Sequence, residues 1–151
     1  VIELVKKSGY PGMKILQFAF DSREESDYLP HNYTHNCVVY TGTHDNDTVM
    51  GWYDTLKGAD KKLCDDYLRL KNADGEPIPR EQIPWEFVRA AMSSVADMAI
   101  IPMQDYLGLG SEARINIPST LGINWMWRMG NGDFTKELAG RIRSMTKLYG
   151  R

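Results

Sequence analysis

The sequence has few cysteines and almost no net charge. It contains Cys 2 among 151 residues, and 18 Lys and Arg oppose 20 Asp and Glu, for a formal net charge of −2. Two cysteines are too few for a disulfide framework, so we expect Cys37 and Cys64 to be free thiols in a reducing, cytoplasmic setting. A near-neutral chain has no overall field to attract phosphate backbones or anionic lipids, which argues against nucleic-acid and membrane partners.

The sequence also lacks long apolar runs, repeats and low-complexity tracts. No stretch reaches the roughly 18 apolar residues that suggest a membrane span, and no signal peptide is recognisable. What it does have is aromatic residues, with Trp 4 and Tyr 8. These serve as core by default, and they also suit stacking on uncharged ligands.

Three short apolar runs read as strands, and helical spacing separates most of them. The strands are expected at about residues 13–20, 37–41 and 99–103, and helices at 1–7, 49–56, 60–70, from Pro84 onward and at 133–149. Short apolar strands alternating with helices are typical of βαβ crossovers and a parallel sheet. Three parallel strands leave two open sheet edges, so the sequence predicts an α/β unit that is part of a larger structure, or one that self-associates through these edges.

The segment GTHDNDT directly follows the second predicted strand and carries His44, Asp45 and Asp47. Loops at the carboxyl ends of parallel strands form the functional face of α/β folds, so a carboxylate here is well placed for chemistry. The alternative is that Asp45 or Asp47 caps the helix that begins near Thr48.

Three chemistries could use this site. Asp45 and Asp47 form a D-x-D pair that could hold a divalent cation, with His31, His35 and Cys37 loosely spaced nearby, although Pro30 and its neighbours argue against a helical ligand pair. A carboxylate and an imidazole could instead hydrogen-bond sugar hydroxyls and stabilise an oxocarbenium-like transition state. A non-catalytic carbohydrate-binding face could use as stacking platforms Trp52, Tyr53, Trp125 and Trp127.

Five segments together resemble the C-terminal third of bacterial and plant 4-α-glucanotransferases of the amylomaltase or disproportionating-enzyme type. These segments are GYPGMKILQFAF, LPHNY, VVYTGTHDNDTVMGWY, RINIPST and NWMWR. The resemblance runs over essentially all 151 residues, and TGTHDNDT with NWMWR is a specific combination. It implies the last three βα units of a (β/α)8 TIM barrel of the α-amylase superfamily, with the whole chain, residues 1–151, as a C-terminal fragment of one catalytic domain.

The resemblance also implies an activity and its residues. Such enzymes cut an α-1,4-glucan and pass the fragment to another sugar with retention of configuration, without a cofactor or metal. Asp45 matches the carboxylate that stabilises the transition state, His44 matches a neighbouring sugar-binding histidine, and Asn124 matches a position in the substrate cleft. Helix capping stays open for Asp47.

The resemblance places the family's nucleophile Asp and acid/base Glu on the fourth and fifth barrel strands, which this chain does not contain. We therefore predict that the isolated chain is inactive. The alternative function is a non-catalytic α-glucan-binding module.

Overall fold

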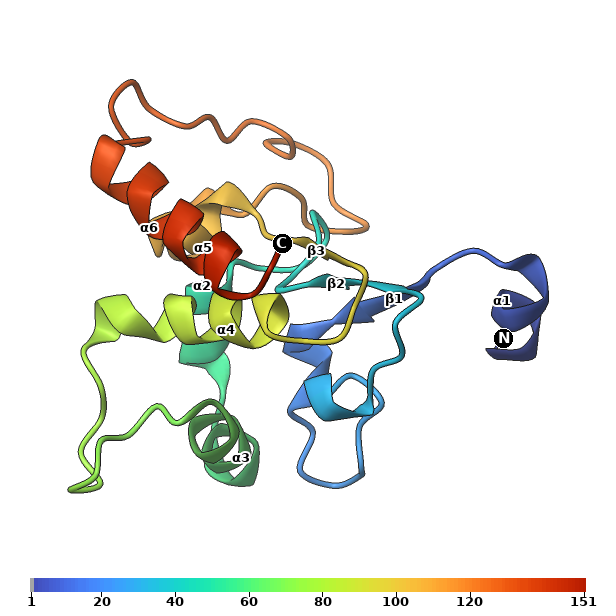
Figure 1. Ribbon diagram of the computed structural model, residues 1–151. Helices are drawn as coiled ribbons and strands as arrows, with labels where there is room; N and C mark the ends of the chain where they lie inside the picture. The colour runs from blue at the N-terminus through green and yellow to red at the C-terminus, as the bar shows by residue number, and fades with distance from the viewer. Residues whose placement is uncertain (1) are drawn as a thin grey trace.

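The computed structural model describes residues 2–151; Val1, which the sequence places in the first helix, lies outside the described residues (Figure 1). Its strands are β1 Gly12–Ile15, β2 Cys37–Tyr40 and β3 Met98–Ile100. Its α-helices are α1 Ile2–Ser8, α2 Val49–Thr55, α3 Gly58–Leu68, α4 Ile83–Met92, α5 Met103–Leu107 and α6 Lys136–Leu148. Each predicted helix is present, with boundaries shifted by a few residues.

The three strands form one parallel sheet in the order β1-β2-β3. Gly12 pairs with Cys37 and Val38 pairs with Met98, so the three carboxyl ends lie along one edge of the molecule. The parallel α/β sheet predicted from the sequence is confirmed. The β2 to β3 connection contains α2, α3 and α4, whereas the β1 to β2 connection contains only short 3₁₀ turns.

The first strand is shorter than the predicted 13–20, because Leu16–Ala19 forms a 3₁₀ helix. In a 3₁₀ turn, side chains three residues apart lie on one side, and Leu16 and Ala19 are both fully buried while Phe18 is exposed. A continued strand would send neighbouring residues to opposite faces. Burial of Leu16 and Ala19 together therefore accounts for the turn.

The third strand also differs from the predicted 99–103. It ends at Ile100, and Pro102 precedes α5, which begins at Met103. Proline has no N–H for a sheet hydrogen bond and a fixed φ that suits a helix start. Met98 and Ile100 of this strand are exposed at the sheet edge.

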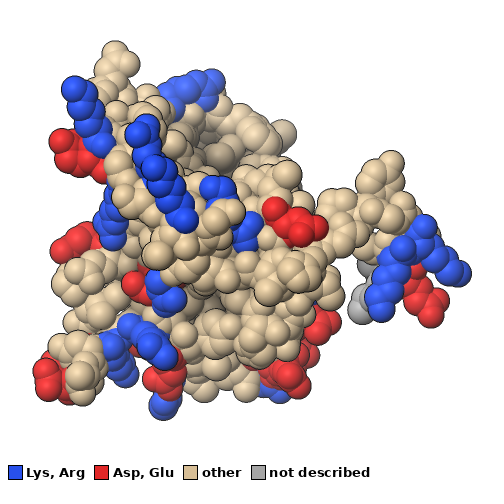
Figure 2. Space-filling view, viewed as in Figure 1, with Lys and Arg blue, Asp and Glu red and all other residues tan. Residues whose placement is uncertain are grey.

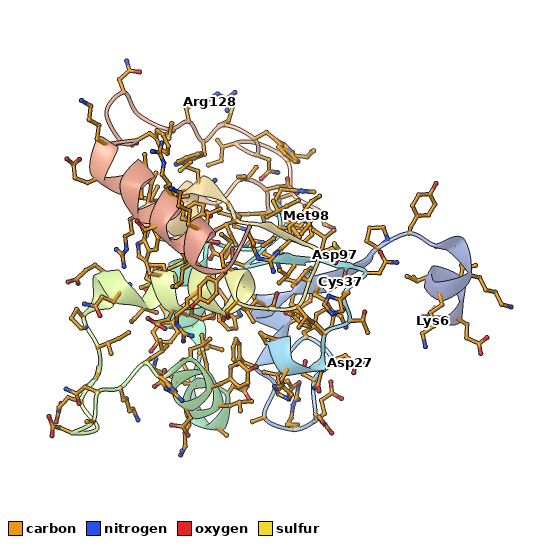
Figure 3. All side chains as sticks on the ribbon, in the orientation of Figure 1. Lys6, Asp27, Cys37, Asp97, Met98 and Arg128 are labelled. Atoms are coloured by element: carbon orange, nitrogen blue, oxygen red, sulfur yellow. The ribbon has the colours of Figure 1, made fainter. Side chains whose placement is uncertain are left out.

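The core lies between the sheet and helices α2, α3 and α4. Helix α4 contacts α2, α3, α5 and α6, and its Phe87 is fully buried among aromatic rings. Trp52 and Phe20 each pack a ring within 6.0 Å of Phe87, centroid to centroid. Cys37 and Cys64 are buried free thiols, as expected. Figure 3 shows Cys37, Asp97 and Met98 together at the amino-terminal ends of the strands, opposite the edge where the loops converge.

Helix α6 closes the other side of α4. Its apolar residues Leu138, Ile142 and Met145 are half-buried, as is Tyr149 at its carboxyl end, and the Arg141 guanidinium lies 3.7 Å from the centre of the Trp85 ring. Helix α1 projects from the body on an extended segment, and residues 114–135 arch beside α6 with turns as their regular structure (Figure 1). On the face shown in Figure 2, positively and negatively charged side chains are scattered among uncharged residues.

Candidate functional site

The carboxyl ends of the three strands bring three segments together. Gln17 follows β1, the loop of residues 41–48 follows β2, and Asp105 lies in α5 shortly after β3. Residues 111–116 then cross the same edge and contact the loop after β2. We call residues 41–48 the THDND loop, after the sequence at its tip.

The tip of the THDND loop is a compact turn. The Asn46 side-chain oxygen accepts hydrogen bonds from the Thr43 amide and hydroxyl at 2.9 and 2.8 Å, and the Asn46 amide donates to the Thr43 carbonyl at 3.1 Å. Asparagine forms such local turns readily. The turn leaves the side chains of His44 and Asp45 53% and 51% exposed.

The Asp45 carboxylate has two side-chain neighbours. His44 Nε2 lies 3.3 Å from Asp45 Oδ1, and Asn116 Nδ2 donates to the same oxygen at 2.7 Å. The Arg114 guanidinium donates to the Asp45 backbone carbonyl at 2.7 Å, which fixes the backbone as well. Both carboxylate contacts are to Oδ1; within residues 2–151 no hydrogen bond goes to Oδ2, and about half of the Asp45 side-chain surface is exposed.

Trp125 stands beside His44. The two rings lie 5.0 Å apart, centroid to centroid, and are tilted by 36°. Trp125 has a positive φ of 66°, a conformation rare for a large side chain, and its amide donates to the Ile115 carbonyl at 2.7 Å. Its ring is half-exposed and provides an apolar face next to the His44 and Asp45 pair.

The other predicted stacking residues divide between core and surface. Tyr53 is buried against Phe87 and cannot serve as a platform, so the prediction is wrong for Tyr53, whereas Trp52 packs against Phe87 and is half-buried. Trp127 is half-buried in the segment that follows Trp125.

The Asn124 side chain makes its hydrogen bonds within its own loop. Its side-chain oxygen accepts from the Ile117 amide at 3.0 Å, and its amide group donates to the Thr120 carbonyl and hydroxyl at 3.1 and 3.0 Å. The residue that the structure brings to Asp45 is Asn116, which the sequence did not single out. The role of Asn124 toward a sugar stays a prediction.

Asp47 does not cap α2. Thr48 is the N-cap, and its hydroxyl accepts from the Gly51 amide at 3.1 Å. Asp47 instead accepts from the Ser111 hydroxyl at 2.6 Å, and its backbone carbonyl accepts from the buried Gln17 amide at 2.8 Å. Asp47 therefore ties the THDND loop to two neighbouring segments.

Asp105 is a further residue that sequence reasoning missed. It is 2% exposed, and its carboxylate accepts from the Thr41 hydroxyl at 2.5 Å and from the Val49 amide at 2.8 Å. Burial, with a smaller effect of the nearby Asp47 charge, raises the pKa of Asp105 to about 6, against the lowering effect of these hydrogen bonds. An acid in an apolar strand-to-helix junction was the available signal, but its partners lie far away in sequence.

The residues proposed above as metal ligands point to different partners. Asp45 contacts Asn116 and Asp47 contacts Ser111, while His31 hydrogen-bonds Tyr67 at 3.0 Å. In the part of the chain that the structure describes, no three His, Cys, Asp or Glu side chains are grouped as a metal site. No helix among these residues is both long and apolar enough to cross a bilayer.

The fold and the site define a class: a parallel α/β protein with a carboxylate and an imidazole at the carboxyl ends of its strands. The family model described as 4-alpha-glucanotransferase matches residues 1–133. The chain therefore belongs to the 4-alpha-glucanotransferase family, as the motifs predicted.

Its relatives are considerably longer. The 4-alpha-glucanotransferase of Clostridium butyricum is 49% identical over 99% of this chain and 30% of the relative. The chloroplastic/amyloplastic enzyme of Arabidopsis thaliana is 47% identical over 100% of this chain and 26% of the relative. The structure of the amylomaltase from Streptococcus agalactiae in complex with acarbose matches with a TM-score of 0.89 and 36% identity, over 99% of this chain and 29% of that one. The chain thus spans less than a third of the proteins that it matches.

Proposed function

We propose that this chain supplies part of the active site of a retaining 4-α-glucanotransferase that moves α-1,4-linked glucan segments between acceptors. Asp45 is the transition-state-stabilising carboxylate and His44 binds the same sugar. The observation that carries the proposal is the His44 and Asp45 pair at the end of a parallel strand, in a chain 36% identical to an amylomaltase whose structure was solved in complex with acarbose.

The geometry of Asp45 suits this chemistry. Glycosyl transfer passes through an oxocarbenium-like state, and contacts to sugar hydroxyls strengthen as that state forms. A group that is already oriented needs little rearrangement during the reaction. Asn116 fixes one oxygen of Asp45 and Arg114 fixes its backbone, which leaves the second oxygen to accept hydrogen bonds from hydroxyl groups.

In this proposal, the chain forms the last three βα units of a complete (β/α)8 barrel. Its sheet has open edges at β1 and β3, where Met13, Met98 and Ile100 are exposed. Further strands would cover these edges, as in a closed barrel. The nucleophile and the acid/base would then come from the part of the relatives that this chain does not span.

Activity assays on two proteins test the proposal. The isolated chain, incubated with maltotriose, should release no glucose and form no longer maltodextrins. A chimera in which this chain replaces the matching 30% of the Clostridium butyricum relative should form both. Steady disproportionation by the isolated chain would contradict the assignment of the missing groups, and a folded but inactive chimera would contradict the proposed function.

A glucan-binding module remains the second candidate, because the exposed Trp125 ring lies beside His44. Calorimetric titration of the isolated chain with maltoheptaose separates the two. Saturable binding that Trp125→Ala abolishes and Asp45→Asn leaves intact would favour a binding module. Sedimentation of the same sample tests whether the chain self-associates through its sheet edges. The cytoplasmic location of the protein stays a prediction.

A further inference from the structure

Asp105 is a carboxylate buried beneath the candidate site, and its position has a high energetic cost. Removing a charged group from water is unfavourable unless hydrogen bonds replace the lost hydration. Asp105 is 2% exposed, and burial raises its pKa to about 6. A neutral side chain here would avoid that cost, so the carboxylate needs an explanation beyond packing.

Its two hydrogen bonds go to the two ends of one loop. Thr41 is the first residue after β2, and Val49 is the first residue of α2. Both donate to Asp105, through the Thr41 hydroxyl and the Val49 amide. The carboxylate therefore joins the start and the end of the segment that presents His44 and Asp45.

A second buried polar side chain holds the same loop from the opposite strand. Gln17, after β1, is buried and donates to the Asp47 carbonyl at 2.8 Å. Gly42 has room for no side chain, since a Cβ there would lie 2.5 Å from the Gln17 amide nitrogen. The loop is thus fixed from both neighbouring strands, and the cavity that remains between the loop and Asp105 is only about 10 Å³.

We propose that Asp105 is a positioning residue: by joining Thr41 to Val49 it sets the direction in which the THDND loop presents His44 and Asp45. It touches no substrate itself. Its effect on catalysis rests on the proposed function, whereas its effect on the loop does not. Small displacements of a catalytic group, on the order of 1 Å, can lower turnover by about 10²-fold.

The test uses the chimera described above and three variants. Asp105→Ala removes both contacts, Thr41→Val removes one, and Asp105→Asn keeps an acceptor for the Val49 amide and can donate to the Thr41 hydroxyl. Asp27→Asn, at an exposed aspartate, is the matched control. Hydrogen exchange of residues 41–49, with residues 83–92 of α4 as internal reference, is measured beside kcat and KM for maltotriose.

We expect faster exchange in residues 41–49, by at least about 10-fold in Asp105→Ala, while residues 83–92 keep their protection. The value of kcat should fall by about 10- to 100-fold with a smaller change in KM. Thr41→Val and Asp105→Asn should lie between wild type and Asp105→Ala, and Asp27→Asn should match wild type.

Unchanged loop exchange in Asp105→Ala would overturn the inference. So would a loss of stability in Asp105→Asn and Thr41→Val with kcat unaltered, which would assign Asp105 a purely structural role. If Asp105→Ala loosens α4 as well, Thr41→Val and Asp105→Asn decide on the same criteria. If the wild-type chimera is folded and inactive, the proposed function fails, and the exchange of residues 41–49 still decides whether Asp105 holds the loop.

Discussion

The two segments that meet at the candidate site are held in different ways. The THDND loop follows β2 and is tied to the ends of the other two strands by the buried side chains of Gln17 and Asp105, and to the exposed Ser111 hydroxyl as well. Residues 117–134 are held mainly by bonds within themselves, such as those of Asn124 to Thr120 and of Arg128 to the Trp125 and Trp127 carbonyls. Most of this second segment is exposed, and Leu121 is fully open to solvent.

The difference follows the physics of what each segment carries. A carboxylate that stabilises a developing charge must be placed accurately, because electrostatic stabilisation depends on distance and orientation. An aromatic ring that stacks on a sugar tolerates sliding and tilting, since its contact is a broad apolar face. Under the proposed function, the THDND loop as the rigid side and residues 117–134 as the adaptable segment suit these two tasks.

Replacement of Asp45 should have the largest effect on the rigid side. In the active chimera we expect Asp45→Asn to lower kcat on the order of 10³-fold with little change in KM, because the lost interaction acts mainly in the transition state. Steady-state kinetics with maltotriose measures both, with Asp27→Asn as the control. An increase in KM at unaltered kcat would instead assign Asp45 to ground-state binding.

The charge of Asp105 should appear in the pH dependence of stability. Its pKa is raised to about 6 in the folded chain and returns to an ordinary value near 3.8 on unfolding, so between these values the folded chain binds more protons. Stability therefore falls as pH rises through this window. Asp105→Asn removes this dependence. The unfolding free energy of Asp105→Asn minus that of wild type should therefore increase by about 1–3 kcal/mol between pH 4 and pH 7.5.

Urea unfolding of the 151-residue chain at both pH values measures this difference. Asp47 and Arg114 line the same small cavity as Asp105. The substitution leaves both residues in place, so wild type and variant carry the same neighbouring charges. If the unfolding free energies of wild type and Asp105→Asn differ by the same amount at pH 4 and at pH 7.5, the raised pKa of Asp105 is contradicted.

Gly51 should matter for the tie between Asp47 and Ser111. A Cβ at position 51 would lie 2.3 Å from the Ser111 hydroxyl oxygen and 2.7 Å from Asp47 Oδ1. We expect Gly51→Ala to destabilise the chain by about 1–2 kcal/mol in urea unfolding, despite the better helix propensity of alanine. Gly140 lies in α6, and an added Cβ there would meet open space, so Gly140→Ala should stabilise the chain by about 0.5–1 kcal/mol. The same sign for both variants would argue against the steric explanation.

The adaptable segment should give the smallest effect on global stability. Asn124→Ala removes three bonds within residues 117–124, and because these are exposed we expect a change of less than about 0.5 kcal/mol in unfolding free energy. Hydrogen exchange of residues 117–125 should nevertheless become faster. In the chimera, a rise in KM without faster exchange would instead support the sugar-binding role that the family resemblance implies for Asn124.

The sequence determined the elements of this protein more fully than their limits. Short apolar runs and helical spacing were enough to predict three parallel strands with helices between them, because these patterns are local. The end of β1 was missed, since the turn at Leu16–Ala19 depends on a core that those residues meet only after folding. Pro102, by contrast, was a local signal that should have ended β3 earlier.

The same division holds for the site. His44 and Asp45 were identified from the sequence, because their motif directly follows an apolar strand. Their partners were not: Asn116 lies 71 residues from Asp45, and Asp105 lies 64 and 56 residues from Thr41 and Val49. Nothing local marks these pairs, since the parallel sheet alone brings the three strand ends to one edge. The sequence by itself pointed to His44 and Asp45 as the candidate groups, and the tertiary structure decided which distant side chains hold them in place, because hydrogen bonds between distant segments form only once the chain has folded.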